Sequence, residues 1–162
     1  MHMYRAQILN FAFGTGDYTV EFWFNAGATG TQYGLYDSRP AGTATYAGLT
    51  LWKTTTQTIQ VYVSATIQIA STTALAVNTW NHVAVSKVSG VTRLFINGIQ
   101  EGSSWTDATT YINGVNRPAL GIDANTVNSS FLYGSIDDLR ITKGIGRYVS
   151  SFTVPTAPFP TN

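Results

Sequence analysis

The stretch Gly134-Ser-Ile-Asp-Asp-Leu-Arg-Ile-Thr142 decides the fold, because apolar and polar residues alternate in it around two adjacent acids. Such alternation is typical of a β-strand with one buried face. Strict parity places Asp137 on the apolar face with Leu139 and Ile141. Asp138 then points to the opposite face. A carboxylate among apolar side chains is costly unless something binds it, so we expect Asp137 to have a hydrogen-bond donor or an ion as its partner.

Period-two alternation recurs along most of the chain. It is cleanest in Asp17–Asn25, where four large apolar side chains fall on one face and are expected in the core. Asn97-Gly98 predicts a type I′ hairpin turn, and no segment predicts a helix of ordinary length. Short strands separated by turn residues predict an antiparallel β-sandwich or barrel. The expected strands are Asp17–Asn25, Tyr33–Asp37, Ala47–Lys53, a hairpin over Thr58–Ser71 that turns near Ser64-Ala65, Trp80–Val88, Val91–Ile96, a strand that starts at Ile99–Gly102, Ala119–Asp123 and Phe131–Thr142.

Length and composition predict one globular domain over residues 1–162. The chain is 44% hydrophobic and 10% charged, with a net charge of +1, so no strong field attracts nucleic acid or an anionic membrane. No stretch approaches the roughly 20 apolar residues that a membrane span needs. Cysteine is absent, which excludes disulfides and thiolate metal sites. Met1–Met3 is interpreted as a remnant of a cloning tag, and the Pro-containing tail Lys143–Asn162 is expected to pack on the body in extended form.

The acids of the sequence do not predict an enzyme. Retaining glycosidases need two carboxylates about 5–5.5 Å apart. Glu21 and Glu101 are the only glutamates, and Asp137 and Asp138 are expected on opposite faces. His82 is the only histidine outside Met1–Met3, and we expect it to pack and hydrogen-bond at a sheet face. No Gly-x-Ser-x-Gly nucleophile elbow accompanies it.

Tryptophans divide into two groups. Trp23 and Trp80 lie in strong strand patterns and are expected in the core. Trp52 ends a strand, and Trp105 lies in the polar stretch Ser103–Asn116, which is interpreted as a loop region. Aromatic faces stack on sugar rings while acids and amides bind the hydroxyls. One hypothesis is a saccharide site, and the alternative is that each loop tryptophan covers the open end of the sandwich. The residues of this candidate saccharide site are Trp52, Trp105, Asp37, Arg39 and Asp107.

Four segments resemble laminin G-like domains of the concanavalin A-like lectin/glucanase superfamily, in the family's order and over nearly the whole chain. They are Asp17-Tyr-Thr-Val-Glu-Phe-Trp-Phe24, Trp80-Asn-His-Val-Ala-Val-Ser86, Arg93-Leu-Phe-Ile-Asn-Gly98 and Gly134–Thr142. The resemblance implies a jelly roll of two antiparallel sheets. The tail, with Lys143-Gly-Ile-Gly-Arg-Tyr148, is similar to tails of such domains in phage tail and other virion proteins.

The resemblance also implies a function and an ion. It implies a non-catalytic module on a virion surface or outside the cell that binds host glycans, or alternatively a purely structural decoration domain whose partners are other virion or surface proteins. Asp137 matches the position of an aspartate that binds an ion in laminarinase-type relatives, so calcium is the candidate cofactor. The alternative is that Asp137 caps backbone N–H groups or pairs with an arginine. Weaker ion candidates are Asp17, Asp107 and Asp123.

Overall fold

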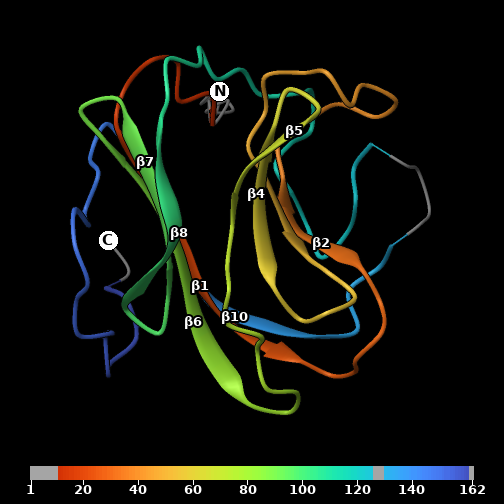
Figure 1. Ribbon diagram of the computed structural model, residues 1–162. Coiled ribbons are helices and arrows are strands. Elements are labelled where there is room, and N and C mark those ends of the chain that lie inside the picture. Colours follow the sequence, from red (N-terminus) through yellow and green to blue (C-terminus); the bar gives the residue numbers. More distant parts are fainter. Residues whose placement is uncertain (1–10, 126–129, 161–162) are drawn as a thin grey trace, which may run out of the picture.

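The computed structural model describes residues 11–125 and 130–160, which form strands and no helix (Figure 1). Met1–Met3 lies outside the described residues, as do the last two residues of the tail, 161–162. None of the described segments forms a helix capable of spanning a bilayer. The strands are β1 (Tyr18–Ala26), β2 (Tyr33–Asp37), β3 (Thr50–Lys53), β4 (Ile59–Val63), β5 (Thr66–Ala70), β6 (Trp80–Val88), β7 (Val91–Ile96), β8 (Ile99–Thr106), β9 (Ala119–Leu120) and β10 (Gly134–Lys143).

These strands form two five-stranded antiparallel sheets that pack face to face (Figure 1). The first sheet has the order β10-β1-β6-β7-β8, and the second sheet has the order β5-β4-β3-β2-β9. Because β6, β7 and β8 are joined by tight turns, they are neighbours in the first sheet, whereas β10 returns from the end of the chain to pair with β1. The predicted two-sheet antiparallel sandwich is confirmed.

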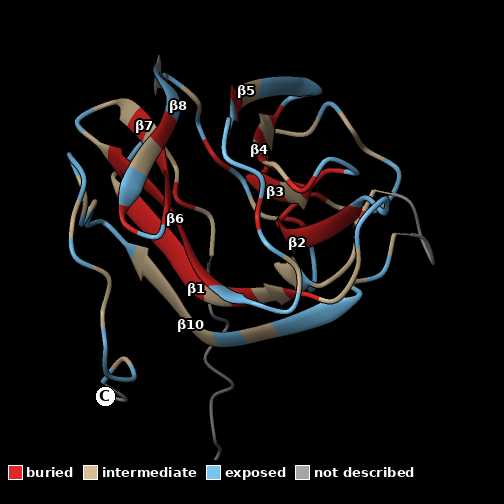
Figure 2. Cartoon of the chain, turned by 60° about the horizontal axis from the view of Figure 1, so that its bottom comes forward, coloured by how far each residue is buried: buried red, intermediate tan, exposed pale blue. Residues whose placement is uncertain are grey.

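The core lies between the sheets and follows the alternation of the sequence. In β1, Tyr18, Val20, Phe22 and Phe24 are fully buried, and in β4 every second residue is buried (Figure 2). The turn at Asn97-Gly98 has φ values of 49° and 79°, which confirms the predicted type I′ geometry. Burial of apolar side chains from both inner faces is therefore the main force that holds the sheets together.

The tail after β10 runs back over the outer face of the first sheet (Figure 2). The N–H of Arg147 donates to Thr19 Oγ1, the N–H of Tyr148 donates to Ser86 Oγ, and the N–H of Phe152 donates to the carbonyl of Gly98. These three hydrogen bonds attach the tail to the first sheet.

A β-bulge in β10 makes the strict-parity prediction wrong for Asp137. Arg140 pairs with Glu21, but Asp137 pairs with Trp23, so β10 has one more residue than β1 between these pairs. The extra residue is accommodated at Asp138, whose φ is +49°. Asp137 therefore lies on the outer face, is exposed, and does not share the apolar face of Leu139.

Two further expectations about tryptophans are wrong. Trp80 is 44% exposed at the start of β6, and Trp23 is half-buried on the outer face of β1. The return strand β8 continues to Thr106, so Trp105 belongs to a strand rather than a loop. Strand pattern identified the strands correctly but did not say which face the large aromatic residues occupy.

Candidate functional site

Two aromatic rings stack on the outer face of the second sheet. Trp52 in β3 and Tyr62 in β4 lie with ring centroids 4.7 Å apart and planes 19° from parallel. They are diagonal neighbours, because Thr50 pairs with Tyr62 and Trp52 pairs with Gln60. Both rings are half-buried, whereas Leu51 and Val61 between them point into the core. The alternation of inward and outward residues thus places Trp52 and Tyr62 together at the surface of the second sheet, and we call this pair of rings the aromatic platform.

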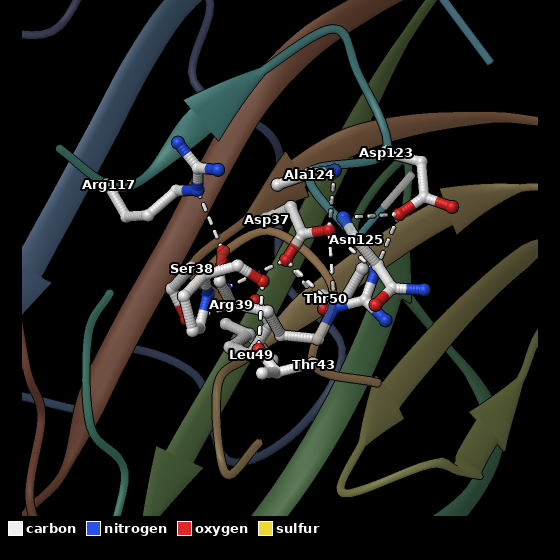
Figure 3. Close-up of polar contacts among 11 residues, drawn as sticks. Asp37, Ser38, Arg39, Thr43, Leu49, Thr50, Arg117, Asp123, Ala124 and Asn125 are labelled. Atoms are coloured by element: carbon white, nitrogen blue, oxygen red, sulfur yellow. Dashed lines mark hydrogen bonds and ion pairs between the residues drawn. The ribbon is translucent and has the colours of Figure 1, made fainter. Parts of the chain in front are cut away.

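Arg39 fixes one side of this platform. Its guanidinium carbon lies 5.3 Å from the centroid of Trp52 and 5.1 Å from that of Tyr62. The same guanidinium donates to Asp37 through Nε at 3.0 Å and Nη2 at 2.6 Å, and to Asp123 through Nη2 at 2.8 Å (Figure 3). Such a bidentate pair fixes the plane of the guanidinium as well as its position.

Burial makes this charge cluster rigid. Arg39 is 1% exposed and Asp37 is fully buried, while the side chain of Asp123 is 13% exposed. Burial disfavours the charged guanidinium, but the hydrogen bonds and charge of Asp37 together with the charge of Asp123 raise the pKa of Arg39 above its ordinary value. The arginine therefore stays charged and is held by the protein's own carboxylates.

Asp37 is occupied by donors from three segments of the chain. Besides Arg39, it accepts from Thr50 Oγ1 at 3.1 Å and from the backbone N–H of Ala124 at 3.0 Å (Figure 3). This last bond anchors the segment 121–125 across β2. The approach is so close that a Cβ atom at Gly34 would lie 2.2 Å from the carbonyl oxygen of Ile122. A glycine is therefore required at this point of β2.

The sequence prediction grouped residues that the structure separates. Asp37, Arg39 and Trp52 come together on the second sheet, whereas Trp105 and Asp107 belong to β8 and to the segment that follows it in the first sheet. Trp105 packs against the core. The sequence analysis missed Tyr62 and Thr50, although the alternation Ile59-Gln-Val-Tyr-Val63 already placed Tyr62 on the face opposite the core.

Asp107 belongs to an internal polar network. It accepts from Thr92 Oγ1 at 2.7 Å and from Tyr111 Oη at 2.8 Å, and Lys87 Nζ lies 3.7 Å from it. Tyr18 donates to the hydroxyl of Tyr111. Burial, followed by the charges of Tyr18 and Asp107, raises the pKa of Tyr111 far above its ordinary value. Asp107 thus joins β8 to the core.

Asp137 and Asp138 lie together at the bulge. The N–H of Asp138 donates to Asp137 Oδ1 at 2.8 Å, and both carboxylate oxygens of Asp138 accept from the N–H of Phe159, at 3.0 and 3.2 Å. Within residues 11–125 and 130–160, no three His, Cys, Asp or Glu side chains are grouped so that they could hold a metal ion. The bulge provides two carboxylates for the six to eight oxygens that calcium takes, so calcium at Asp137 stays a prediction from the resemblance.

His82 is fully buried, as its predicted structural role requires. Its ring lies edge-on to Trp23 at 5.4 Å and to Phe152 of the tail at 5.8 Å. Its Nε2 lies 3.3 Å from Glu21 Oε2. The histidine therefore fills the space between the first sheet and the tail.

A family model described as the concanavalin A-like lectin/glucanases superfamily matches residues 5–144. The chain belongs to this superfamily. The match confirms the family predicted from the four sequence motifs, and it ends just before the part of the tail that covers the first sheet. No curated protein sequence matches the chain.

Solved structures of the superfamily's fold include modules with sugars bound. The CBM40 of the Ruminococcus gnavus IT-sialidase, bound to α2,6 sialyllactose, superposes with a TM-score of 0.65 at 14% identity, over 84% of this chain and 80% of that chain. Domain 4 of AbnA, a GH43 extracellular arabinanase from Geobacillus stearothermophilus, in complex with arabinotriose, has a TM-score of 0.59 at 20% identity, over 83% of this chain and 64% of that chain. A heptameric SAP-like pentraxin from Limulus polyphemus has a TM-score of 0.56 at 14% identity, over 80% of this chain and 65% of that chain. The chain thus spans less than two thirds of the arabinanase domain and of the pentraxin, and at these identities the likeness concerns the fold alone.

Proposed function

We propose that this domain is a non-catalytic carbohydrate-binding module and that the sugar packs against the stacked pair formed by Trp52 and Tyr62. The observation that carries the proposal is the stacked pair of half-buried rings held by the buried Arg39–Asp37 ion pair. The apolar face of a pyranose or furanose ring packs well on such an aromatic surface. The sugar-bound structures of the same fold, a CBM40 and an arabinanase domain, support the proposal.

Preorganisation is the main advantage of this arrangement. Asp37 and Asp123 hold the guanidinium, and the guanidinium holds both rings, so little side-chain freedom is lost when a ligand binds. Asp123 and Gln60 lie at or near the rings with partly exposed side chains that can accept or donate to hydroxyl groups. Arg39 is neutralised by two carboxylates and is 1% exposed, so the site has no free cation for an acidic sugar and favours neutral glycans.

The site lacks the pair of available carboxylates that hydrolysis needs. Asp37 already accepts from Arg39, Thr50 and Ala124. A rigid, neutralised acid at the edge of an aromatic platform positions a ligand but does not exchange protons with it. We infer that the domain binds sugars and leaves them unchanged.

The virion is the proposed setting for this binding. Its support is the similarity of the segment from Lys143 onward to tails of phage and virion proteins. In this setting the module sits on a tail fibre or capsid surface and recognises host glycans. The alternative is a structural decoration domain that binds other virion proteins, and the low content of charged residues, 10%, suits a surface that packs against protein.

A glycan array followed by calorimetry tests the proposal with a matched pair of tryptophan variants. Trp52→Ala removes the platform and is expected to weaken binding at least tenfold, because a central stacking tryptophan usually contributes about 2 kcal/mol or more. Trp80→Ala serves as the control, since Trp80 is 44% exposed on the first sheet, and is expected to bind as the unaltered domain does. Equal affinity of the Trp52→Ala variant, or an array without any ligand, would contradict the proposed site. An empty array together with stable co-assembly on virus particles would favour the structural alternative.

A further inference from the structure

A pocket lies between the first sheet and the tail, away from the aromatic platform of the second sheet. The tail is bonded to the body at Phe152, through Gly98, and at Phe159, through Asp138. Between these anchors, residues 154–158 form the outer wall of a pocket of about 520 Å³. The inner wall is formed by Trp23 of β1 with Asp137 and Asp138 of β10. Its volume lies in the range of small-molecule sites.

The β-bulge is the reason that both acids line the same pocket. In a regular strand, adjacent side chains point to opposite faces. Here the extra residue in β10 and the φ of +49° at Asp138 break that rule, and both aspartates line the pocket beside Trp23. The sequence-based expectation that these two acids lie on opposite faces of a regular strand is therefore wrong.

The walls of the pocket combine three kinds of chemistry. Carboxylates only accept hydrogen bonds, so two of them attract a group with several donors and a positive charge. The indole of Trp23 attracts cations over its face and packs against carbon rings. Val154, Pro155 and Pro158 supply apolar surface on the tail side.

Arg140, on the same strand as these acids, has other partners. Arg140 pairs with Glu21 at 2.7 Å, and its guanidinium carbon lies 3.7 Å from the ring centroid of Phe159. Arg140 is not among the residues that line the pocket. Of the described residues that line the pocket, none carries a positive charge, so the two aspartates give the pocket a negative character.

We propose that this pocket binds an amino sugar, with its ammonium group on Asp137 and Asp138 and its ring on Trp23. The hexose ring matches the flat indole and the volume of the pocket better than the narrow stem of a lysine side chain does. The proposal does not depend on the glycan site at Trp52, because the two sites lie on different sheets.

Calorimetry at pH 7 with three sugars that share the same pyranose ring tests it. Glucosamine carries the ammonium group, N-acetylglucosamine has lost it, and glucose never had it. Glucosamine is expected to bind in the millimolar range and at least fivefold more tightly than the other two, with an affinity that falls as salt is raised, because the carboxylates are partly exposed. Nα-acetyl-lysine amide provides the same cation on a protein-like stem and is expected to bind more weakly than glucosamine.

Asp137→Asn is the variant that isolates the charge. Its side chain is exposed and does not hold the tail, and the amide oxygen can still accept from the N–H of Asp138, so the fold is expected to stay intact. Glucosamine affinity should fall about fivefold, while the affinity for glucose should not change. Asp17→Asn, which removes a carboxylate that accepts from the N–H of Ser89, is the charge-matched control and should have no effect.

Four results would overturn the proposal. Equal affinities for glucosamine and N-acetylglucosamine would show that the ammonium group does not contribute to binding. Tighter binding of the lysine amide would assign the pocket to a protein partner. Loss of glucosamine binding in Trp52→Ala would show that glucosamine binds at Trp52 on the second sheet and not in this pocket. Displacement of glucosamine by 1 mM CaCl₂, with a rise in melting temperature, would assign the carboxylates to calcium.

Discussion

Glu21 illustrates, at the scale of one residue, how the first sheet keeps a buried charge. Its side chain is fully buried beneath the tail, where Arg140 Nε donates to Oε1 at 2.8 Å and Tyr148 Oη donates to Oε2 at 2.8 Å. Burial by itself would raise the pKa of Glu21, but His82, Tyr148 and Arg140 together hold it below its ordinary value. The carboxylate is therefore ionised because its partners are in place.

Glu21→Gln is expected to lower the free energy of unfolding by about 3 kcal/mol at pH 7, because it leaves Arg140 without its buried partner.

The pH dependence of the free energy of unfolding has a definite sign. A folded-state pKa below the unfolded value of about 4.5 stabilises the protein above pH 4.5, and this stabilisation is lost as the pH falls through the folded-state pKa. Urea unfolding at pH 7, 5 and 3 should show a shallower acid dependence in the variant. Asp137→Asn, with an exposed carboxylate, is the control and should differ from the unaltered domain by less than about 0.5 kcal/mol; identical slopes for all three proteins would contradict the role of Glu21.

The positions of some single residues could be predicted from the sequence, and those of others could not. The residues of the aromatic platform could be inferred, since Trp52 and Tyr62 alternate with core residues of β3 and β4. The bulge at Asp138 could not, because nothing in Asp137-Asp138 distinguishes a regular strand from one with an extra residue. Trp80 was misplaced for another reason: it is the first residue of its strand, and there it is 44% exposed.

The tail after β10 is the element that lies beyond residues 5–144, the part of the chain that the family model matches. Phe152 stacks on Tyr148 with ring centroids 3.6 Å apart, and it meets Phe95 of β7 edge-on at 5.4 Å. These aromatic contacts cover polar groups of the outer face, including Glu21. The tail therefore acts as a third layer over the first sheet.

Phe152→Ala is expected to destabilise the domain by about 1–2 kcal/mol, because it removes a half-buried ring that contacts Tyr148, Phe95 and His82. The loss of stability should be concentrated in the tail. Hydrogen exchange should speed up at the N–H groups of Arg147 and Tyr148, which donate to Thr19 and Ser86, more than at the N–H groups of β6. Phe131→Ala, at a ring that is 57% exposed, is the control. Uniform exchange across tail and sheet would show instead that the tail unfolds only with the whole domain.

At the same scale, most strands follow from the sequence, whereas the end of β8 and the course of the tail do not. The bounds of β2, β6 and β7 are those predicted, because each is flanked by turn residues such as Ser89-Gly90 and Asn97-Gly98. The end of β8 was misjudged, since its last residues Ser103–Thr106 carry little apolar character at the edge of the sheet. That the tail lies over the outer face of β1 depends on contacts more than 100 residues apart, which no local pattern encodes.

The whole molecule is a sandwich with two unlike sides. On one side β5 and β8 approach so closely that a Cβ atom at Gly102 would lie 2.6 Å from the carbonyl oxygen of Ala70. On the other side, a second pocket of about 520 Å³ lies between β10 and the segments at Gly121 and Leu132. The closed side fixes the spacing of the two sheets, while the open side carries the bulge and its carboxylates.

Gly102→Ala tests how far the closed side determines stability. Gly102 has a φ of +65°, so any side chain there costs about 1–2 kcal/mol of backbone strain, and the added methyl group must also push β5 away from β8. Gly30→Ala is the matched control, because Gly30 has a φ of +73° but nothing lies within 4 Å of the place its Cβ would take. The control is expected to lose about 1 kcal/mol in urea unfolding, and Gly102→Ala about 3 kcal/mol, since only the second variant disturbs the contact between the sheets. Tyr62 lies on β4, the neighbour of β5, and Trp52 lies on β3, the next strand. A shift of β5 should therefore also weaken glycan binding in Gly102→Ala, whereas binding should be unchanged in Gly30→Ala. Equal losses of stability in both variants would show that the two edges adjust freely and that the spacing of the sheets is determined by the core alone.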